Sequence, residues 1–371
     1  MRVSRLELRD FRNYERAEAE LSPSLTVVSG PNGAGKTNLL EALCFVCTGR
    51  SPRTANEREL VRRGAAVARL VLDTADEVGE HRIELGFEPG EAKRLRVDGR
   101  PVDGPAGLSE RPLVALFMPE RLELVKGAPS ARRAHLDQLV AALWPARADG
   151  RGAYSRALAQ RNALLARIRA GAATPSALDV WDVELGRAGV RLMRDRAAAA
   201  AELCPTFAAR GRELGLPGEP ELRYRPRSEA ADAEALAAEL GERRSADIER
   251  GFTAHGPHRD ELQLLLDGIP LRAYGSQGQQ RSALLALLLA ERDVLASARG
   301  REPLLLLDDV MSELDVARRE LLSELLRGGG QAVVTATEPE HVPGADGAGV
   351  QLLEVLGAAV RPAGGRTERV A

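Results

Sequence analysis

The sequence predicts an α/β fold in which residues 1–120 and 251–371 build one sheet-containing part, with a mainly helical lobe, residues 121–250, inserted between them. Three observations lead to this prediction. A glycine-rich loop at residues 30–37 stands between an apolar run and a helical segment. A second apolar run, Leu304–Leu307, ends in two aspartates. Between these features the chain is rich in Ala, Leu, Arg and Glu at helical spacing.

The first 43 residues predict two strands, a loop and a helix. Residues 1–29 alternate polar and apolar side chains, as an opening pair of strands does, and Leu25–Val28 is an apolar strand. Asn38–Leu43 then predicts a helix. The loop between them matches the phosphate-binding pattern G-x-x-x-x-G-K-[ST] at every position. Its residues are Gly30, Pro31, Asn32, Gly33, Ala34, Gly35, Lys36 and Thr37.

Each position of this loop suits a nucleotide phosphate. The glycines permit turns that point successive N–H groups inward, and the following helix adds its positive N-terminal end. Lys36 is predicted to reach the β- and γ-phosphates, and the Thr37 hydroxyl to hold Mg²⁺. We therefore expect ATP and Mg²⁺ as cofactors. The alternative is a chance glycine-rich turn before a helix.

The next stretch is predicted to be β-rich, with strands at residues 67–73, 81–87 and 95–97 and a hairpin turn at Val97–Arg100. A basic group precedes and enters it, made of Arg50, Arg53, Arg58, Arg62 and Arg63. This group is either a solvated face or a contact with nucleotide or DNA. Cys44 and Cys47 form a C-x-x-C on the apolar helix, where core packing competes with a metal or redox role.

After another buried strand at residues 113–117, the lobe predicts helices at residues 153–169, 178–203 and 236–249 and a loop at residues 214–228. Glycines and prolines interrupt the heptad pattern, so we expect a compact or short-armed lobe. They are Gly171, Pro175, Gly186, Gly189 and Pro205.

The C-terminal part returns to α/β character. Residues 262–266 and 269–272 bracket Asp267-Gly268, a hairpin signal, and Tyr274–Arg281 opens the apolar helix 282–295. The strand Leu304–Leu307 then presents Asp308 and Asp309 at its end. A carboxylate there is predicted to bind Mg²⁺ together with Thr37, the alternative being a buried strand capped by exposed acids.

Composition limits the function classes. The 371 residues contain no apolar run long enough for a membrane span, and the charged start leads into no signal-peptide core, so we expect a cytoplasmic protein without a membrane partner. Three cysteines are too few for a disulfide scaffold. A net charge of −2 does not indicate nucleic-acid binding, and aromatic residues at 3% supply few stacking platforms. DNA binding would therefore rely on phosphate contacts.

The order of these motifs resembles the ATPase heads of the ABC class, especially its SMC-like DNA-repair branch, with a bipartite head and an inserted lobe. Within that class, six ordered blocks resemble the RecF family of bacterial recombination mediators. The blocks are Leu8–Tyr14, Phe117–Glu120, Lys126–Arg133, Gly256–Asp260, Ser276–Arg281 and Asp308–Asp315.

The resemblance implies an ATP-dependent homodimer that binds single- and double-stranded DNA at gap junctions. It also implies partners, RecR with RecO, and help in loading RecA onto DNA covered by single-strand-binding protein. A weak, DNA-stimulated ATPase would act as a switch. In this class the signature segment of one protomer contacts the γ-phosphate held by the other, which assigns Ser276, Gly278 and Gln279 to the nucleotide.

The resemblance makes Lys36, Asp308 and Asp309 the catalytic set, with Thr37 and Asp308 on the metal. Asp309 stands where many relatives have a glutamate that orients the attacking water, and the shorter side chain favours slow turnover. No histidine follows the strand at residues 331–335 until His341, and Thr337 is either a γ-phosphate contact or a plain strand end.

Two alternative functions remain open at this point. A transporter-type ABC motor is compatible with the outline, although the glutamines of the signature segment and the missing histidine disfavour it. A phosphoryl-transfer enzyme could use the same phosphate loop. His258 is expected to be structural and not a metal ligand, because no other ligand lies at useful spacing.

Overall fold

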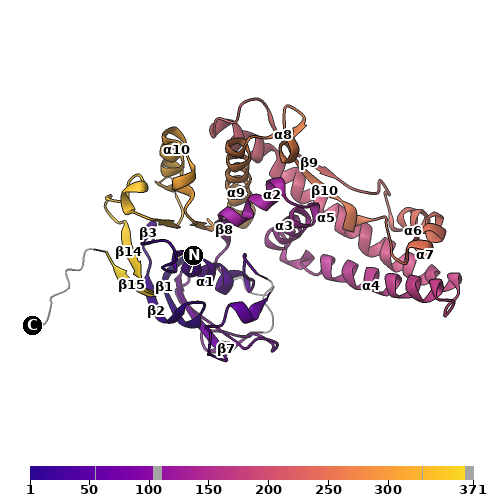
Figure 1. Ribbon diagram of the computed structural model, residues 1–371, viewed down its shortest axis with the longest axis horizontal. Coiled ribbons are helices and arrows are strands. Elements are labelled where there is room, and N and C mark those ends of the chain that lie inside the picture. The colour runs from indigo at the N-terminus through magenta and orange to yellow at the C-terminus, as the bar shows by residue number, and fades with distance from the viewer. Residues whose placement is uncertain (55, 103–110, 328, 364–371) are drawn as a thin grey trace, which may run out of the picture. The chain divides into compact units, whose positions relative to one another are not determined.

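The computed structural model describes residues 1–54, 56–102, 111–327 and 329–363. The chain divides into two compact units (Figure 1). Unit 1 contains Met1–Arg121 and Glu291–Ala371, and unit 2 contains Leu122–Ala290. The sequence placed residues 251–290 with the ends of the chain, whereas here they pack with unit 2. The reason is strand pairing, since a strand within them pairs with one inside the lobe.

Unit 1 holds an antiparallel sheet of six strands in the order β2-β1-β4-β5-β6-β7. Its strands fall where the sequence predicted them, with apolar side chains on alternate positions facing the core. The predicted turn is also present, because Asp98 and Gly99 both have positive φ, of 51° and 77°. The strands are β1 (Arg2–Phe11), β2 (Tyr14–Glu20), β4 (Ala68–Ala75), β5 (Glu80–Phe87), β6 (Arg94–Val97) and β7 (Arg100–Pro101).

The second sheet of unit 1 has the order β15-β14-β3-β13-β12-β8. It draws on both ends of the chain, and all pairs except β14 with β15 are parallel. The inner strands β3, β12 and β13 are mainly apolar and buried along their whole length, because both faces of the sheet are covered. The strands are β3 (Leu25–Ser29), β8 (Val114–Phe117), β12 (Leu304–Leu307), β13 (Ala332–Ala336), β14 (Gln351–Leu356) and β15 (Ala359–Pro362).

Helix α1 (Lys36–Thr48) contacts strands of both sheets. It is buried almost all round, and its Phe45 packs edge-on against Phe87 of β5 at 5.0 Å between ring centroids. The helix ends at Gly49, which takes the left-handed conformation of a C-cap. One continuous core therefore fixes the phosphate loop, which lies directly before α1, to both sheets. Unit 1 also carries α10 (Val316–Arg327).

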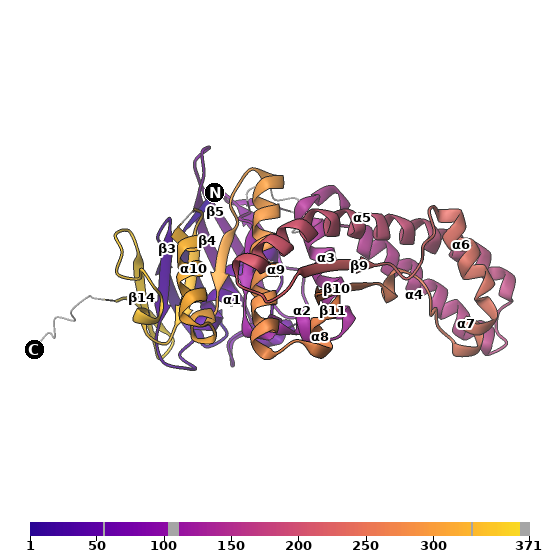
Figure 2. The same cartoon turned by 90° about the horizontal axis from the view of Figure 1, so that it is seen from above.

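Unit 2 is mainly helical, with a three-stranded antiparallel sheet ordered β11-β10-β9 (Figure 2). The long helices α4 and α5 pack against each other, and α6 packs on α5. The elements are α2 (Glu123–Lys126), α3 (Pro129–Leu143), α4 (Gly150–Arg169), α5 (Leu178–Glu213), β9 (Pro220–Arg225), α6 (Ala233–Glu242), α7 (Arg244–Arg250), β10 (Glu261–Leu266), β11 (Ile269–Pro270) and α8 (Leu271–Tyr274). Helix α9 (Gln277–Arg299) begins in unit 2 and ends in unit 1.

Three sequence predictions for the lobe were wrong. Residues 220–225, predicted as loop, form β9, because Leu222 and its alternate neighbours pair along β10. Helix α5, predicted to end at Leu203, continues through Pro205 to Glu213, because its last turns bury Phe207 and Gly211 and pack against β9. The single helix predicted for residues 236–249 is two helices, α6 and α7, that meet at Arg243.

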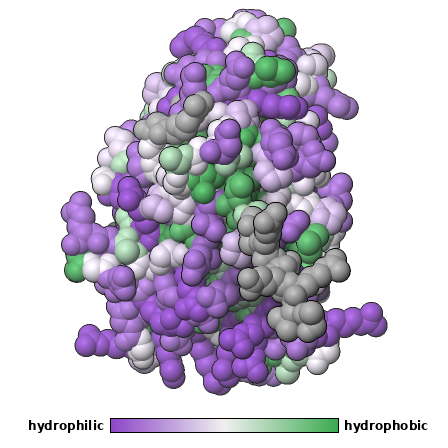
Figure 3. Space-filling model, turned by 90° about the vertical axis from the view of Figure 1, so that its left-hand side faces the viewer, coloured by the Kyte–Doolittle hydropathy of each residue, from purple (hydrophilic) through white to green (hydrophobic). Residues whose placement is uncertain are grey.

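Hydrophilic side chains cover most of the face shown in Figure 3, with hydrophobic ones gathered near its middle. Within the described residues, no helix combines the length and the apolar character that a membrane crossing requires.

Candidate functional site

The phosphate loop connects β3, an inner strand of the parallel sheet, to α1. At two positions of the loop only glycine fits, because a Cβ atom would overlap neighbouring atoms. Gly30 has φ 145°, and a Cβ there would overlap the carbonyl oxygen of Val355. Gly35 has φ 123°, and a Cβ there would lie 2.7 Å from Asn13 Nδ2 and 2.8 Å from the Tyr14 hydroxyl. Gly33, with φ 79°, faces open space.

Residues at the turn between β1 and β2 form hydrogen bonds to the backbone of the phosphate loop. Asn13 Nδ2 donates to the Ala34 carbonyl (3.1 Å), and the buried Tyr14 hydroxyl donates to the Gly35 carbonyl (2.9 Å). Asn38 in turn donates to Asn13 Oδ1 (2.8 Å). From the sequence, Asn13 and Tyr14 belong to the block Leu8–Tyr14 that resembles the RecF family, but no role for either residue could be predicted. The loop residues Pro31, Asn32 and Gly33 stay exposed.

Lys36 lies in the loop with its ammonium group close to the backbone. Its Nζ donates to the carbonyl oxygens of Gly30 (2.6 Å) and Pro31 (3.0 Å). Burial lowers the pKa of Lys36, while Asp309 and Asp308 act in the opposite direction. The ammonium is thus held against two carbonyl oxygens of the loop, with which a bound phosphate would compete for it.

Asp308 and Thr37 meet directly although 271 positions separate them. The Thr37 hydroxyl donates to Asp308 Oδ2 (2.8 Å), and the Thr335 hydroxyl donates to Asp308 Oδ1 (2.7 Å). Parallel pairing of β12, β13 and β3 brings these three side chains to one edge of the sheet. Burial raises the pKa of Asp308, and the two hydroxyl bonds oppose that rise. A hydroxyl and a carboxylate are oxygen ligands of the kind Mg²⁺ takes alongside phosphates and water.

Asp309 has a backbone conformation rare for a non-glycine residue, with φ 48° and ψ 26°. Its N–H donates to Thr335 Oγ1 (2.9 Å), so one threonine hydroxyl joins both aspartates of the strand end. Sequence reasoning gave Thr335 no role, because only the sheet reveals that it lies beside Asp308. Thr337, left open above, accepts a weak bond from the Gly30 N–H at its carbonyl (3.4 Å), and its hydroxyl lies 3.3 Å from His341 Nδ1.

A buried carboxylate on α1 organises part of the basic group. Glu41 is fully buried and receives two bonds from Arg12 (2.8 and 2.6 Å), one from Ser51 (2.6 Å) and one from Arg53 (3.3 Å). Arg62 pairs with Asp10 at 2.7 Å. Arg53 and Arg62 of the basic group are therefore paired with carboxylates, and Arg50, Arg53, Arg58 and Arg63 are exposed.

The signature segment lies in unit 2 at the start of α9. Ser276 and Gln279 cap the helix reciprocally: Gln279 N donates to Ser276 Oγ (3.2 Å), and Ser276 N donates to Gln279 Oε1 (2.7 Å). Ser276 and Gly278 are exposed, and a Cβ on Gly278 would meet nothing within 4 Å. Gln280 is instead buried and donates to the Leu271 carbonyl (2.9 Å).

Residues outside these motifs take structural positions. His258 Nδ1 lies 2.7 Å from the Tyr154 hydroxyl and Nε2 lies 3.0 Å from the Thr253 carbonyl, and burial lowers the pKa of His258 to about 4. Cys44 and Cys47 are buried in the core, and burial raises the pKa of Cys44 to about 11. Both outcomes match the structural alternatives given above. Among the described residues, no cluster of three or more His, Cys, Asp or Glu side chains could hold a metal ion.

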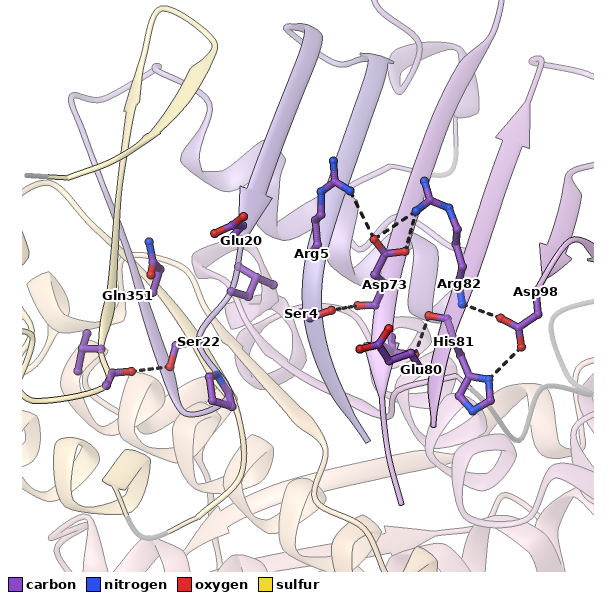
Figure 4. A pocket seen from close by; sticks show the side chains of 15 residues that line it. Ser4, Arg5, Glu20, Ser22, Asp73, Glu80, His81, Arg82, Asp98 and Gln351 are labelled. Atoms are coloured by element: carbon purple, nitrogen blue, oxygen red, sulfur yellow. Dashed lines mark hydrogen bonds and ion pairs between the residues drawn. The ribbon is translucent and has the colours of Figure 1, made fainter. Parts of the chain in front are cut away.

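An open groove of about 820 Å³ lies in unit 1 and contains no residue of the phosphate loop (Figure 4). Several of its charged side chains are paired with one another. Arg82 bonds to Asp73 (3.1 Å) and donates its N–H to Asp98 (2.8 Å), and His81 Nδ1 lies 2.9 Å from the same Asp98 carboxylate. The lining carries four carboxylates, those of Glu20, Asp73, Glu80 and Asp98, against the two arginines Arg5 and Arg82, so the groove does not suit an anionic phosphate.

Comparisons with known proteins agree with this architecture. A family model described as an AAA domain matches residues 5–111. A Streptomyces avermitilis protein named DNA replication and repair protein RecF is 42% identical over 357 residues, which are 93% of this chain and 95% of that protein. A protein of the same name from an Anaeromyxobacter species is 41% identical over 372 residues, covering 98% and 99%.

Solved structures extend the similarity to three dimensions. A structure described as the recombination mediator protein RecF-ATP in the RecFOR pathway has a TM-score of 0.87 and 27% identity, covering 97% of each chain. An Smc head bound to the C-winged helix domain of ScpA has a TM-score of 0.57 and 15% identity, covering 98% of this chain and 97% of that one, and supports the fold alone.

The fold is that of an ABC-type P-loop ATPase head of the SMC-like kind, as the sequence predicted. Within that class, identity above 40% over more than nine-tenths of the chain is decisive. The chain belongs to the RecF family of DNA replication and repair proteins. The comparisons do not favour the transporter-type alternative.

Proposed function

We propose that the protein is an ATP-dependent, DNA-binding recombination mediator that dimerises around ATP. The observation that carries the proposal is the bond between Thr37 and Asp308, which joins the phosphate loop to the acidic strand end. The ATP-bound RecF structure, similar along the whole chain, supports the choice of nucleotide.

Residues 30–36 would hold the phosphates through backbone N–H groups and the Lys36 ammonium. Thr37 and Asp308 would hold Mg²⁺, which neutralises charge that develops on the phosphates. Asp309 would orient the attacking water. Its carboxylate sits one methylene shorter than the glutamate common at such positions, which fits slow hydrolysis that acts as a switch.

The signature segment would serve the nucleotide of a second protomer. Ser276 Oγ accepts the Gln279 N–H, so the hydroxyl proton is free to be donated outward. Exposure of Ser276 and Gly278 at the start of α9 leaves them accessible to a γ-phosphate. Two protomers would then enclose two ATP molecules, with Gln279 holding the cap in shape.

The closed dimer would bind DNA at gap junctions in the cytoplasm and, with RecR and RecO, help load RecA onto strands covered by single-strand-binding protein. Hydrolysis would open the dimer and release the DNA. Support for this role is membership of the RecF family and the description of its ATP-bound relative as a recombination mediator.

Binding of a fluorescent gapped duplex, measured by anisotropy with and without ATP and Mg²⁺, tests the proposal. We expect tight binding only with ATP. Lys36→Ala removes a charge-assisted phosphate contact and should weaken ATP binding by about 10- to 100-fold and abolish the ATP effect on DNA. Lys126→Ala, at an exposed lysine of α2, is the control. Unchanged nucleotide affinity in Lys36→Ala would refute the assignment.

A further inference from the structure

A small pocket of about 190 Å³ in unit 2 uses sequence blocks that the nucleotide site leaves unexplained. We call it the arginine pocket and define it by Ser130, Arg133, Arg151, Ser155, Arg196 and His258. Ser130 and Arg133 come from the block at residues 126–133, and His258 comes from the block at residues 256–260. Ser130 and Arg133 lie on α3, Arg151 and Ser155 lie on α4, and Arg196 lies on α5.

Hydrogen bonds and ion pairs hold the floor of the arginine pocket. Arg196 is buried, forms two bonds with Asp137 (2.7 and 3.0 Å), and uses its remaining terminal nitrogen on Asp260 (2.9 Å) and the Pro257 carbonyl (2.7 Å). His258 is held by Tyr154 and Thr253 at its two ring nitrogens. These groups already have their partners, so they shape the pocket.

The rim differs from the floor because its cations are poorly compensated. Arg133 is half-buried and makes one bond, from Nη1 to the Asp260 carbonyl (2.8 Å). Arg151 keeps 49% of its side chain exposed, and its nearest carboxylate oxygen, on Asp137, lies 3.6 Å away. Ser130 and Ser155 place exposed hydroxyls on the same rim.

The local charge balance is positive. Three guanidinium groups line the pocket, those of Arg133, Arg151 and Arg196. Two carboxylates lie against them, those of Asp137 in the lining and Asp260, which bonds to Arg196, so the excess is one positive charge. Arg132 and Glu261 pair with each other at 2.8 Å and do not alter the balance. The first turn of α3, whose N-cap residue Ala128 makes no side-chain bond, adds partial positive charge beside Ser130.

We propose that the arginine pocket binds a backbone phosphate of DNA, an inference that rests on the proposed function. Guanidinium forks and hydroxyl donors around a concave floor match phosphate oxygens in geometry and charge. A phosphodiester on DNA and free inorganic phosphate share this chemistry, so the experiment has to separate them. Contact at this pocket would give unit 2 a direct part in holding DNA.

The test adds negative charge to the rim in one variant and removes a positive charge in another. The residues of the floor are left unchanged. Ser130→Asp with Ser155→Asp, and separately Arg151→Gln, should weaken binding of gapped DNA in ATP by about 10-fold. The slope of log affinity against log salt should fall by about one. Arg156→Gln on the same helix, 68% exposed and paired with Asp149, is the matched control and should bind like the parent. ATP affinity and the circular dichroism spectrum should not change.

The outcomes separate the two proposals. If the parent protein binds DNA with ATP and all variants keep its affinity and salt slope, the pocket does not hold DNA. If the parent protein does not bind DNA at all, the proposed function fails first. Thermal unfolding with inorganic phosphate is the remaining arm. Stabilisation of the parent but not of Arg151→Gln, with unchanged DNA binding, would assign the pocket to free phosphate and overturn the proposal.

Discussion

Asp308, near the C-terminal end of the chain, contacts Thr37 of the N-terminal phosphate loop, so residues from both ends form one candidate nucleotide site. Both carboxylate oxygens accept threonine hydroxyls, from Thr37 and Thr335, and burial disfavours the charged form. The sequence predicted the pairing of Thr37 with Asp308 because each belongs to a motif. It could not predict Thr335, Asn13 or Tyr14 as supports, since their contacts depend on strand register and turn geometry and not on any local pattern.

Replacing Asp308 separates metal binding from phosphate binding. Asp308→Asn should weaken Mg²⁺-dependent ATP binding by about 10-fold or more, because a neutral amide is a poor Mg²⁺ ligand. Since burial raises the pKa of Asp308, Mg²⁺ affinity of the parent should begin to fall at a higher pH than an exposed aspartate would allow. Calorimetric titration of ATP with and without Mg²⁺ measures both effects. Equal Mg²⁺ dependence in the variant would contradict the assignment.

Asp309→Asn is the companion variant. We expect ATP binding and ATP-dependent dimerisation to persist while hydrolysis slows by about 10-fold or more, because the water-orienting carboxylate is lost. Phosphate release under single-turnover conditions is the measurement. Hydrolysis at the parental rate would exclude Asp309 from the catalytic set.

Glu291 on α9 gives a pH-dependent stability. Burial raises its pKa to about 7, against the effect of Arg121. Between its ordinary value of 4.5 and about 7 the folded protein binds more protons than the unfolded chain, so the free energy of unfolding falls as pH rises through this range. Relative to Glu291→Gln, the parent should lose about 2–3 kcal/mol between pH 4.5 and pH 8. Urea unfolding of both, with the exposed Glu242→Gln as control, checks this, and parallel pH profiles would contradict it.

At the scale of elements, most strands of unit 1 were predictable because a buried sheet leaves strong alternating or continuous apolar patterns. Strands β14 and β15 were not predicted. Unit 2 was less predictable. The sequence predicted a helix over residues 178–203 in which Gly186 and Gly189 interrupt the heptad pattern, and glycine has low helix propensity. A Cβ on Gly186 would lie 2.5 Å from the Ala233 carbonyl oxygen, and one on Gly189 would lie 2.6 Å from Leu236 Cδ2. Close approach of α6 therefore explains why two glycines stand inside this helix.

Gly186→Ala tests this packing. Overlap with the α6 backbone should destabilise unit 2 by about 1–3 kcal/mol, more than the gain in helix propensity. Gly241→Ala, in α6 where a Cβ meets nothing within 4 Å, should be neutral or stabilising by up to about 1 kcal/mol. Thermal unfolding of both variants decides it. Equal melting temperatures for the two would show that the contact between α5 and α6 does not need glycine.

At the scale of the whole molecule, the phosphate loop and the acidic strand end lie in unit 1, whereas the exposed signature segment opens α9 in unit 2. Under the proposed function, the signature segment of a second protomer completes the nucleotide site. The sequence could predict this arrangement only through resemblance to a known class, because nothing in one chain's local pattern specifies its partner.

Sedimentation velocity with and without ATP and Mg²⁺ tests the central claim most directly. The account predicts a monomer that becomes a dimer when ATP is added. It also predicts that Ser276→Arg still binds ATP but stays monomeric, because the bulky cation blocks the entry of a second phosphate loop. A parent protein that sediments as the same species in both conditions, or a Ser276→Arg variant that dimerises normally with ATP, would contradict it.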